Sequence, residues 1–196
     1  MSVSETWDDE ADNWIKWART PGHDVYRFYS SSFFDEIVPS PSGLVLELGC
    51  GEGRVVRDLE SLGHEVVGLD PSPTMVRHAR QEDIHGAYVI APGEQLPFAE
   101  GAFDLVIAYN SLQNVEDLAK TVAEVERVLT TDGRFCMCIA HPMSDAGRFE
   151  SAQPDAPFTV KGSYYGPRRV DEKSNAMGLR SPSTAWPIRS RSTHEH

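Results

Sequence analysis

The stretch that decides the fold is Val45-Leu46-Glu47-Leu48-Gly49-Cys50-Gly51-Glu52-Gly53. It runs from an apolar, strand-like segment into a glycine-rich turn that opens a helix. Glycines in such a turn let the backbone approach a ligand closely, because no Cβ stands in the way. The start of the following helix offers free N–H groups to a carboxylate or a phosphate. The stretch therefore predicts a strand–turn–helix unit that binds a ligand.

Working outward from this unit, five strand-like segments alternate with amphipathic stretches. They are Leu44 to Leu48, Glu65 to Leu69, Ala87 to Ile90, Phe103 to Tyr109 and Phe135 to Ala140. Their apolar residues run together instead of alternating, which is typical of strands covered by helices on both faces. Strands that alternate with helices indicate a parallel sheet with crossover connections. We therefore predict an α/β fold with a Rossmann-like, doubly wound and mostly parallel sheet.

The stretches between these strands carry helical signals of their own. Apolar residues share one helical face in three groups: Val55, Val56, Leu59 and Leu62; Met75, Val76 and Ala79; Leu118, Val122, Val125 and Leu129. Ser72 and Pro73 suit the N-cap and the first position of the second helix. Gly63 and Gly133 follow the first and third groups, where a left-handed residue can end a helix. The pattern is βαβαβ and onward.

The two ends of the chain differ from this central pattern. One helical stripe near the N-terminus contains Trp7, Ala11, Trp14, Ile15 and Ala18. We expect this helix to pack against the domain as a structural support, with a lid over its mouth as the second interpretation. Beyond Pro142 the periodicity fades, and the one strand candidate is Phe158 to Tyr165. We therefore expect the terminal strands to be missing or altered, and the residues from Lys173 onward to be mobile.

Charge and composition exclude several classes of partner. The chain has 196 residues and a formal net charge of -12, which repels polyanions, so nucleic acid is not expected to bind. No apolar run approaches the roughly 18 residues of a membrane helix. Three cysteines, Cys50, Cys136 and Cys138, cannot all pair, and no metal-ligand spacing is present, so we expect reduced thiols and no metal site. We expect a cytoplasmic protein without a membrane partner.

Two acidic residues distinguish between cofactors. A dinucleotide fingerprint needs glycine at position 54, where this chain has Arg54, so a nicotinamide cofactor is the weaker alternative. Glu47 lies two residues before the first glycine, where it would crowd a pyrophosphate but attract an ammonium or sulfonium group. Asp70 lies 21 residues after Gly49, at the end of the second strand and before Pro71, and is placed to accept ribose hydroxyls.

Five ordered motifs together resemble class I S-adenosylmethionine-dependent methyltransferases of the type 11 family. They are Glu47 to Gly53, Asp70 after an apolar strand, Leu96-Pro97-Phe98, Phe103-Asp104-Leu105-Val106 and the Leu129 to Gly133 turn. The resemblance covers about Leu44 to Ile139, roughly half the chain. It implies a seven-stranded sheet, S-adenosyl-L-methionine across the carboxyl ends of the first strands, and methyl transfer to a small-molecule acceptor.

The resemblance also implies roles for individual residues. The turn formed by Gly49, Cys50, Gly51 and Gly53 would wrap the methionyl part, while Asp70 and the adjacent Pro71 would lie at the ribose. Met75 would contact the adenine. Many relatives have an aspartate after the third strand that meets the adenine amino group, but Pro92 occupies that position here. The contact would then come from the Gly93 backbone or from Glu94, and Asn110 would lie near the reactive methyl.

Methyl transfer from a sulfonium is an in-line displacement, so a dedicated base is optional. If the acceptor must lose a proton, His141 after the fifth strand is the first candidate base and Tyr109 the second. Tyr26, Tyr29 and Trp17 could line the acceptor pocket, although core packing accounts for each of them as well. The sequence Tyr109-Asn110-Ser111 has neither the Pro-Pro-aromatic run of base-modifying enzymes nor carboxylates for a metal.

The predicted organisation has three parts. Residues 1–40 form an N-terminal helical cap, residues 41–142 the methyltransferase domain, and residues 143–196 an irregular, partly disordered segment. Missing terminal strands would leave one sheet edge open for self-association. A protein that binds the cofactor but is catalytically inactive, serving interaction or regulation, remains the main alternative to an active enzyme.

Overall fold

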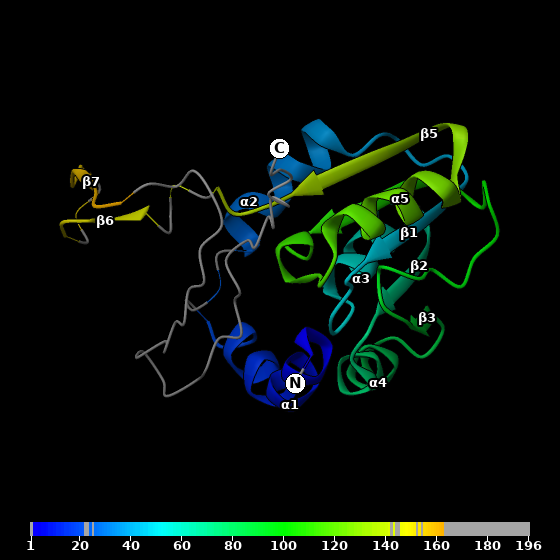
Figure 1. The fold of residues 1–196 in the computed structure, drawn as a ribbon, viewed down its shortest axis with the longest axis horizontal. Coiled ribbons are helices and arrows are strands. Elements are labelled where there is room, and N and C mark those ends of the chain that lie inside the picture. The colour runs from blue at the N-terminus through cyan, green and yellow to red at the C-terminus, as the bar shows by residue number, and fades with distance from the viewer. Residues whose placement is uncertain are drawn as a thin grey trace, which may run out of the picture.

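The computed structural model describes residues 2–162 except 22, 23, 25, 142, 144, 145, 152 and 154. Its centre is a parallel sheet of five strands in the order β3-β2-β1-β4-β5 (Figure 1). The strands are β1 Leu44–Leu48, β2 Glu65–Asp70, β3 Ala87–Ile90, β4 Phe103–Tyr109 and β5 Leu129–Cys138. The α/β, mostly parallel fold predicted from the sequence is confirmed.

Helices cover both faces of this sheet. The helices are α3 Arg54–Ser61, α4 Pro73–Glu82 and α5 Leu118–Val128. Side chains of α3 and α4 share one core with Val45 and Ile107, whereas Val125 and Val128 of α5 share the other with Leu46 and Val106. Because alternate residues of β1 and β4 enter different cores, nearly all of their side chains are buried. This explains why their apolar residues run together in the sequence.

Most of the residues predicted to begin or end helices do so, but Gly133 lies within β5 without a positive φ and does not end α5. The Ser72 side chain accepts the Met75 N–H and so caps α4, which begins at Pro73. Gly63 follows α3 with φ of +93°, a conformation that a Cβ would strain. Leu62, which was placed on the apolar face of this helix, lies beyond its last residue and is exposed.

Two details of the third helix and the fifth strand differ from the prediction. In α5 the buried side chains are Thr121, Val125 and Val128, and Leu118 and Leu129 pack against the same core. Val122 is exposed, so it is the one member of the predicted apolar face that is wrong. The strand β5 begins at Leu129 instead of Phe135 and ends at Cys138. Its first pair is Phe103 with Leu129 and its next is Leu105 with Arg134. The polar residues between them bulge from the strand, which is why they resemble a turn in the sequence.

The N-terminal residues form α1 Val3–Ala18, followed by α2 Tyr26–Ser32 and the π-helix η1 Phe33–Ile37. A capping box begins α1, because the Ser2 side chain accepts the Glu5 N–H and the Glu5 carboxylate accepts the Ser2 N–H. Ala11 and Ile15 of this helix are buried against Met75 of α4. The predicted N-terminal helix is therefore present and packs on the sheet domain (Figure 1).

Beyond β5, two short antiparallel strands, β6 Gly147–Phe149 and β7 Phe158–Val160, form a separate sheet. The strand candidate Phe158 to Tyr165 thus appears in part, and the tail from Lys173 onward lies outside the described residues. Within the described ranges β5 pairs with β4 alone, so it forms an edge of the main sheet. Self-association through this edge stays a prediction.

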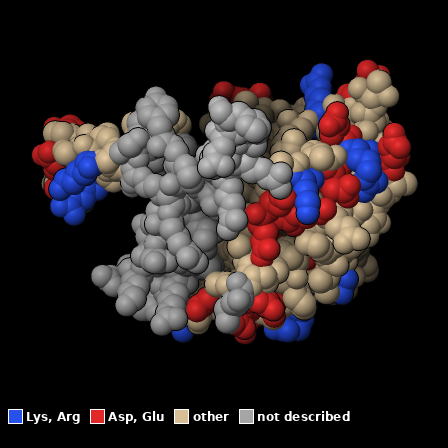
Figure 2. Space-filling view, viewed as in Figure 1, with Lys and Arg blue, Asp and Glu red and all other residues tan. Residues whose placement is uncertain are grey.

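Two features of the described residues concern membranes and metal ions. None of the described helices is long and apolar enough to cross a membrane. Among the described residues, no group of three or more His, Cys, Asp or Glu side chains could hold a metal ion. Figure 2 shows acidic side chains gathered on the face over α5, in keeping with the negative net charge.

Candidate functional site

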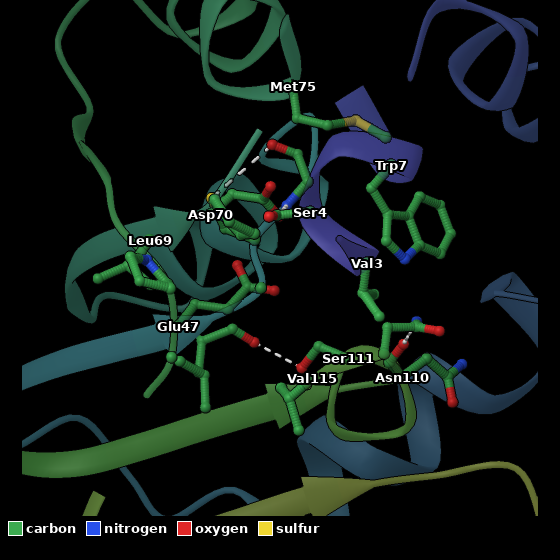
Figure 3. A pocket seen from close by; sticks show the side chains of 18 of the residues that line it. Val3, Ser4, Trp7, Glu47, Leu69, Asp70, Met75, Asn110, Ser111 and Val115 are labelled. Atoms are coloured by element: carbon green, nitrogen blue, oxygen red, sulfur yellow. Dashed lines mark hydrogen bonds between the residues drawn. The ribbon is translucent and has the colours of Figure 1, made fainter. Parts of the chain in front are cut away.

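A cavity of about 530 Å³ lies at the carboxyl ends of β1, β2 and β4, with α1 on its far side. Figure 3 shows Glu47 and Asp70 on the sheet side of this cavity, and Val3 and Trp7 from α1 opposite them. Ligands of open α/β sheets bind at the carboxyl ends of the strands. The predicted cofactor residues that line the cavity are Glu47, Gly49, Cys50, Gly51, Asp70, Pro71, Met75, Gly93, Glu94 and Asn110.

The glycine turn has the conformation that the ligand-binding prediction requires. Gly49, Gly51 and Gly53 have φ of +75°, +55° and +82°, which side chains other than glycine rarely adopt. The N–H groups of Gly49 and Cys50 both donate to the Leu69 carbonyl, at 2.7 and 2.9 Å, and hold the turn against β2. A Cβ on Gly51 would meet no heavy atom within 4 Å, so it would project into open space.

The three glycines have different neighbours and different uses. A Cβ on Gly49 would lie 2.4 Å from the Ser111 Cβ, so this glycine allows close packing of the turn on the loop after β4. A Cβ on Gly53 would lie 2.6 Å from the Tyr88 hydroxyl. Gly53 is not among the cavity residues, and its close contacts are with the protein itself. Its assignment to the cofactor stays a prediction.

Asp70 is nearly buried at the end of β2 and has two backbone donors. Its Oδ2 accepts the Gly51 N–H and its Oδ1 accepts the Ser72 N–H, both at 2.9 Å. Burial raises the pKa of Asp70 to about 6, although the two backbone N–H groups oppose the rise. An ionised carboxylate offers about four lone-pair sites. Asp70 can therefore hold the glycine turn and still accept two hydroxyl groups from a ligand.

Glu47 is a fully buried carboxyl group in the middle of a sheet strand. It is 1% exposed, and its Oε2 has no hydrogen-bond partner among the described residues. Burial raises the pKa of Glu47 well above its ordinary value, and the charge of Asp70 adds to the rise, whereas Arg54 opposes it. An unpartnered buried carboxyl oxygen is costly. A cationic ligand group in the cavity would offset that cost.

Another part of the cavity wall is formed by Met75, Pro71 and the loop after β3. Met75 is 3% exposed and packs against α1. Glu94, a candidate partner of adenine, uses its Oε1 to accept the N–H groups of Glu116 and Asp117, at 2.8 and 3.0 Å. This carboxylate therefore holds the start of α5 in place, in addition to lining the cavity.

The end of β4 brings Tyr109 and Asn110 to the cavity. Asn110 has φ of +53°, the only positive value among the described residues other than glycine. Such strain is typical of functional positions, and asparagine tolerates it better than most residues. Burial raises the pKa of Tyr109 to about 12, and the adjacent Cys138 thiol adds to the rise. Tyr109 is therefore a protonated phenol at neutral pH, suited to form a wall or donate a hydrogen bond.

The other candidates for catalysis or acceptor binding do not line the cavity. His141 is exposed, and its Nδ1 accepts the Met143 N–H at 3.1 Å. Tyr29 is 62% exposed, and Trp17 is half-buried. Tyr26 is in the core, where its hydroxyl donates to Asp58 at 2.7 Å. The roles of these residues in catalysis or acceptor binding stay predictions.

The sequence interpretation missed how much of the cavity wall comes from α1. Ser2, Val3, Ser4, Trp7 and Trp14 all line it. Polar contacts tie this helix to the site: Asp8 accepts the Ser72 hydroxyl at 2.5 Å and the Thr74 N–H at 2.9 Å. The pKa of Asp8 is lowered, first by the Ser72 hydroxyl. The two tryptophans in the apolar stripe are the signal that could have shown it.

Charged contacts also fix the C-terminal end of α1. Arg19 donates to Glu52 at 2.7 Å, and Arg57 donates to the same carboxylate oxygen at 3.0 Å. Glu52 is 4% exposed and belongs to the glycine turn. One buried carboxylate thus connects α1, the glycine turn and α3.

Arg54 also lines the cavity, near the Trp14 end of α1. Its guanidinium group lies 4.1 Å from the ring centre of Tyr26 and 5.4 Å from that of Trp14, and pairs with Asp24.

These residues fit S-adenosylmethionine in three places. The open space at Gly51 admits a backbone-sized group, and α3 begins beside it. The bare Oε2 of Glu47 matches a sulfonium or ammonium group. Asp70 has acceptor capacity left for two ribose hydroxyls.

A family model and two named methyltransferases among known proteins agree with this fit. Residues 46–137 match the model of the methyltransferase domain family. A demethylmenaquinone methyltransferase from Beutenbergia cavernae is 30% identical over 139 residues, which are 71% of this chain and 54% of that protein. The mitochondrial arginine-hydroxylase NDUFAF5 of Mus musculus is 34% identical over 94 residues, 47% of this chain and 27% of that protein. The chain thus spans about half or less of the length of these two relatives.

A solved structure shows the same arrangement of the fold. It is an S-adenosylmethionine-dependent methyltransferase from Mesorhizobium loti, 26% identical, with a TM-score of 0.62. The match covers 73% of this chain and 69% of that chain.

Proposed function

Because the chain belongs to the class I S-adenosylmethionine-dependent methyltransferases, we propose that it transfers a methyl group to a small-molecule acceptor. The observation that carries the proposal is the buried, unpartnered carboxyl oxygen of Glu47 beside the glycine turn. A nicotinamide cofactor would bring a pyrophosphate to this place, where a carboxyl group repels it. A sulfonium cofactor brings a positive charge instead.

Each part of the site has a defined task in this proposal. S-adenosylmethionine, when bound, supplies an electrophilic methyl group on a positively charged sulfur. Asp70 and the glycine turn hold the ribose and the methionyl part, and Glu47 stabilises the positive charge. Asn110 and Tyr109 form the wall at the carboxyl end of β4, where the methyl group is expected. The acceptor's lone pair forms the new bond as the carbon–sulfur bond breaks, so alignment and exclusion of water carry the catalysis.

The name of one relative supports a small acceptor. The cavity of about 530 Å³, a volume in the roughly 300–1,000 Å³ range of small-molecule sites, holds the cofactor in this proposal. Residues of α1 line the side of the cavity that lies opposite Glu47 and Asp70. One relative is named as a demethylmenaquinone methyltransferase, whose substrate is a small molecule, and this name supports the same acceptor class.

Release of labelled methyl groups tests the proposal. The protein is incubated with methyl-labelled S-adenosylmethionine and a panel of phenols, quinols, amines and carboxylic acids, with an arginine-containing peptide as the protein-type acceptor. We expect transfer to at least one small molecule, and less transfer by Glu47→Gln. Binding of the cofactor with no transfer to any acceptor would favour the inactive, regulatory alternative. Transfer to the peptide alone would contradict the small-molecule class.

A further inference from the structure

Proton removal from an acceptor is poorly served by the described residues of the cavity. No histidine is among the described lining residues, and the lining Tyr109 is a phenol whose pKa burial raises to about 12. His141, the first candidate base, lies outside the cavity. Phenols and alkyl amines have pKa values of about 10 and are protonated at neutral pH, whereas a carboxylic acid is already ionised. The cavity therefore suits an acceptor that arrives as an anion.

The carboxylates among the described lining residues are committed to other partners. Four of them accept N–H groups of the protein at 2.6 to 3.1 Å: Glu52, Glu94, Glu116 and Asp117. Glu47 and Asp70 bind the cofactor in the proposed function. A general base must lie within hydrogen-bond reach of the proton that it removes. Because these carboxylates hold the cavity wall or the cofactor, the acceptor has no base among the described residues.

Arg54, the first residue of α3, places an accessible positive charge on the cavity wall. Its guanidinium group lies 4.1 Å from the ring centre of Tyr26 and donates from one nitrogen to Asp24. A guanidinium group has five N–H donors. The hydrogen bond to Asp24 is the one that the described residues provide, and 25% of the Arg54 side chain is exposed. Arg54 is thus held in a fixed orientation with donors left for a ligand.

Arg54 lies close to the expected position of the methyl group. Tyr109, which forms the wall there, packs edge-on against Tyr26 with 5.3 Å between the ring centres, and Tyr26 in turn contacts Arg54. Burial raises the pKa of both Tyr109 and Glu47, and the charge of Arg54 opposes this rise in each, so its field reaches the place where the sulfonium is expected. Like charges repel each other. The cofactor alone therefore does not account for Arg54, whereas an anion between the guanidinium and the methyl group does.

We infer that the methyl acceptor is a small carboxylic acid whose carboxylate binds to the Arg54 guanidinium, because a fixed guanidinium with free donors lines a site without a base. This inference rests on the proposed function and names its substrate class. Arginine suits the role, since its planar group can bind both oxygens of a carboxylate. A carboxylate oxygen forms a bond to the methyl carbon with its lone pair, while the carbon–sulfur bond breaks and leaves its electron pair on sulfur. The products are a methyl ester and S-adenosylhomocysteine with a neutral sulfur, and no proton moves.

The first test determines which acceptor atom receives the methyl group. The full chain is incubated with methyl-labelled S-adenosylmethionine and acetate, octanoate, benzoate or 4-hydroxybenzoate, with octylamine and phenol as counterparts that lack a carboxylate. Alkali releases labelled methanol from a methyl ester but not from a methyl ether or a methylamine. We expect alkali-labile label with at least one acid. With saturating cofactor, kcat/KM for that acid should not change between about pH 7 and 9, because a carboxylate is fully ionised over this range.

Substitutions of Arg54 test its role in binding the acid. Arg54→Met should lower kcat/KM for the acid about 10- to 100-fold, the loss expected for charge-assisted hydrogen bonds. Arg54→Lys keeps the charge but not the planar fork, so its kcat/KM should lie between those of the Met variant and the wild type. Lys120→Met removes the other basic side chain among the described lining residues and should keep the wild-type kcat/KM. Calorimetry with S-adenosylhomocysteine checks folding, and the affinity should stay within about threefold of the wild type in both Arg54 variants, since this ligand has no charge on sulfur.

Results with the wild-type protein alone can overturn the inference, even if a variant does not fold. Transfer to none of the acids, or a kcat/KM that rises from about pH 7 to 9 as a base or an amine loses its proton, would do so. The proposed function still stands in these cases if another small molecule is methylated. If the wild-type protein does not bind S-adenosylhomocysteine at all, the proposed function fails, and the inference fails with it.

Two results with the Arg54 variants would also contradict the inference. The first is an unchanged kcat/KM for the acid in Arg54→Met. The second is a loss of S-adenosylhomocysteine affinity of more than about tenfold in Arg54→Met, with no loss for 5′-methylthioadenosine, which lacks the amino-acid part. Arg54 would then bind the carboxylate of the cofactor, and the proposed function would stand without the inference.

Discussion

Replacing Asp70 with alanine should remove a pH-dependent loss of stability from the ligand-free protein and weaken its binding of the cofactor. Asp70 is 8% exposed, and burial raises its pKa from 3.8 to about 6 even though Gly51 and Ser72 donate backbone hydrogen bonds to it. A carboxyl group whose pKa is higher in the folded state contributes stability below its unfolded pKa, and that contribution is lost as pH rises through the folded pKa. The ionised form of Asp70 therefore lowers the stability of the ligand-free protein, while it provides the charge that binds the cofactor.

The magnitude follows from the two pKa values. The difference between 3.8 and about 6 corresponds to about 3 kcal/mol at 1.36 kcal/mol for each pH unit. The alanine variant lacks this pH dependence, so its unfolding free energy relative to the wild type should rise by as much as about 3 kcal/mol from pH 4 to above pH 6. Loss of the hydrogen bonds to the Gly51 and Ser72 N–H groups lowers the unfolding free energy by about 1–3 kcal/mol for each bond at every pH. Loss of the charge-assisted hydrogen bonds to the ribose should weaken cofactor binding by about 1–3 kcal/mol.

Urea unfolding at pH 4.5, 6 and 8 measures the first effect, and calorimetry with S-adenosylhomocysteine at pH 8 measures the second. Asp70→Asn is the matched variant, because it removes the charge but keeps one oxygen as an acceptor for a backbone N–H. It should show the same pH-dependent gain with a smaller loss of affinity. The pKa of Asp70 is not raised in the folded protein if the unfolding free energy of the alanine variant, relative to the wild type, does not rise from pH 4.5 to pH 8.

Three other changes test separate parts of the site. Gly51→Val should reduce cofactor affinity at least about 100-fold in calorimetry, because its side chain would fill the open space at the turn. Gly101→Val is the control: Gly101 also has a positive φ but lies outside the cavity, so this variant should keep the affinity of the wild type. Glu52→Ala should lower the unfolding free energy by about 1–3 kcal/mol, since Arg19 and a second arginine lose their shared partner; equal stability in urea would contradict this role. His141→Ala should lower the methyl-transfer rate less than about tenfold, because the side chain is exposed and outside the cavity, whereas a general base contributes about 10²–10⁴-fold.

Much of the sheet could be predicted from the sequence because its strands are buried on both faces. The runs Leu44–Leu48, Ala87–Ile90 and Phe103–Tyr109 have the same bounds in the structure as in the sequence pattern. The start of β5 could not be predicted, since the bulge between Leu129 and Arg134 contains exposed polar residues and a glycine. Polar residues in a bulge and in a turn follow the same pattern.

The candidate site could be predicted in part, for a similar reason. Glu47, Gly51 and Asp70 lie within a few residues of strand ends, so the topology alone brings them to one edge. Trp7 and Asn114 line the same cavity, but the first depends on how α1 packs across the sheet and the second on a 3-10 helix. Irregular loops have no period in the sequence, so Asn114 could be found in the structure alone, whereas for Trp7 the tryptophans of the apolar stripe were a signal.

The most direct test of the account is calorimetric titration of the full chain with S-adenosylmethionine and, separately, with NADH. The account predicts saturable binding of S-adenosylmethionine at one site, weakened in Glu47→Gln and lost in Gly51→Val, with much weaker binding of NADH. No binding of S-adenosylmethionine to the folded wild-type protein, or tighter binding of NADH, would contradict it.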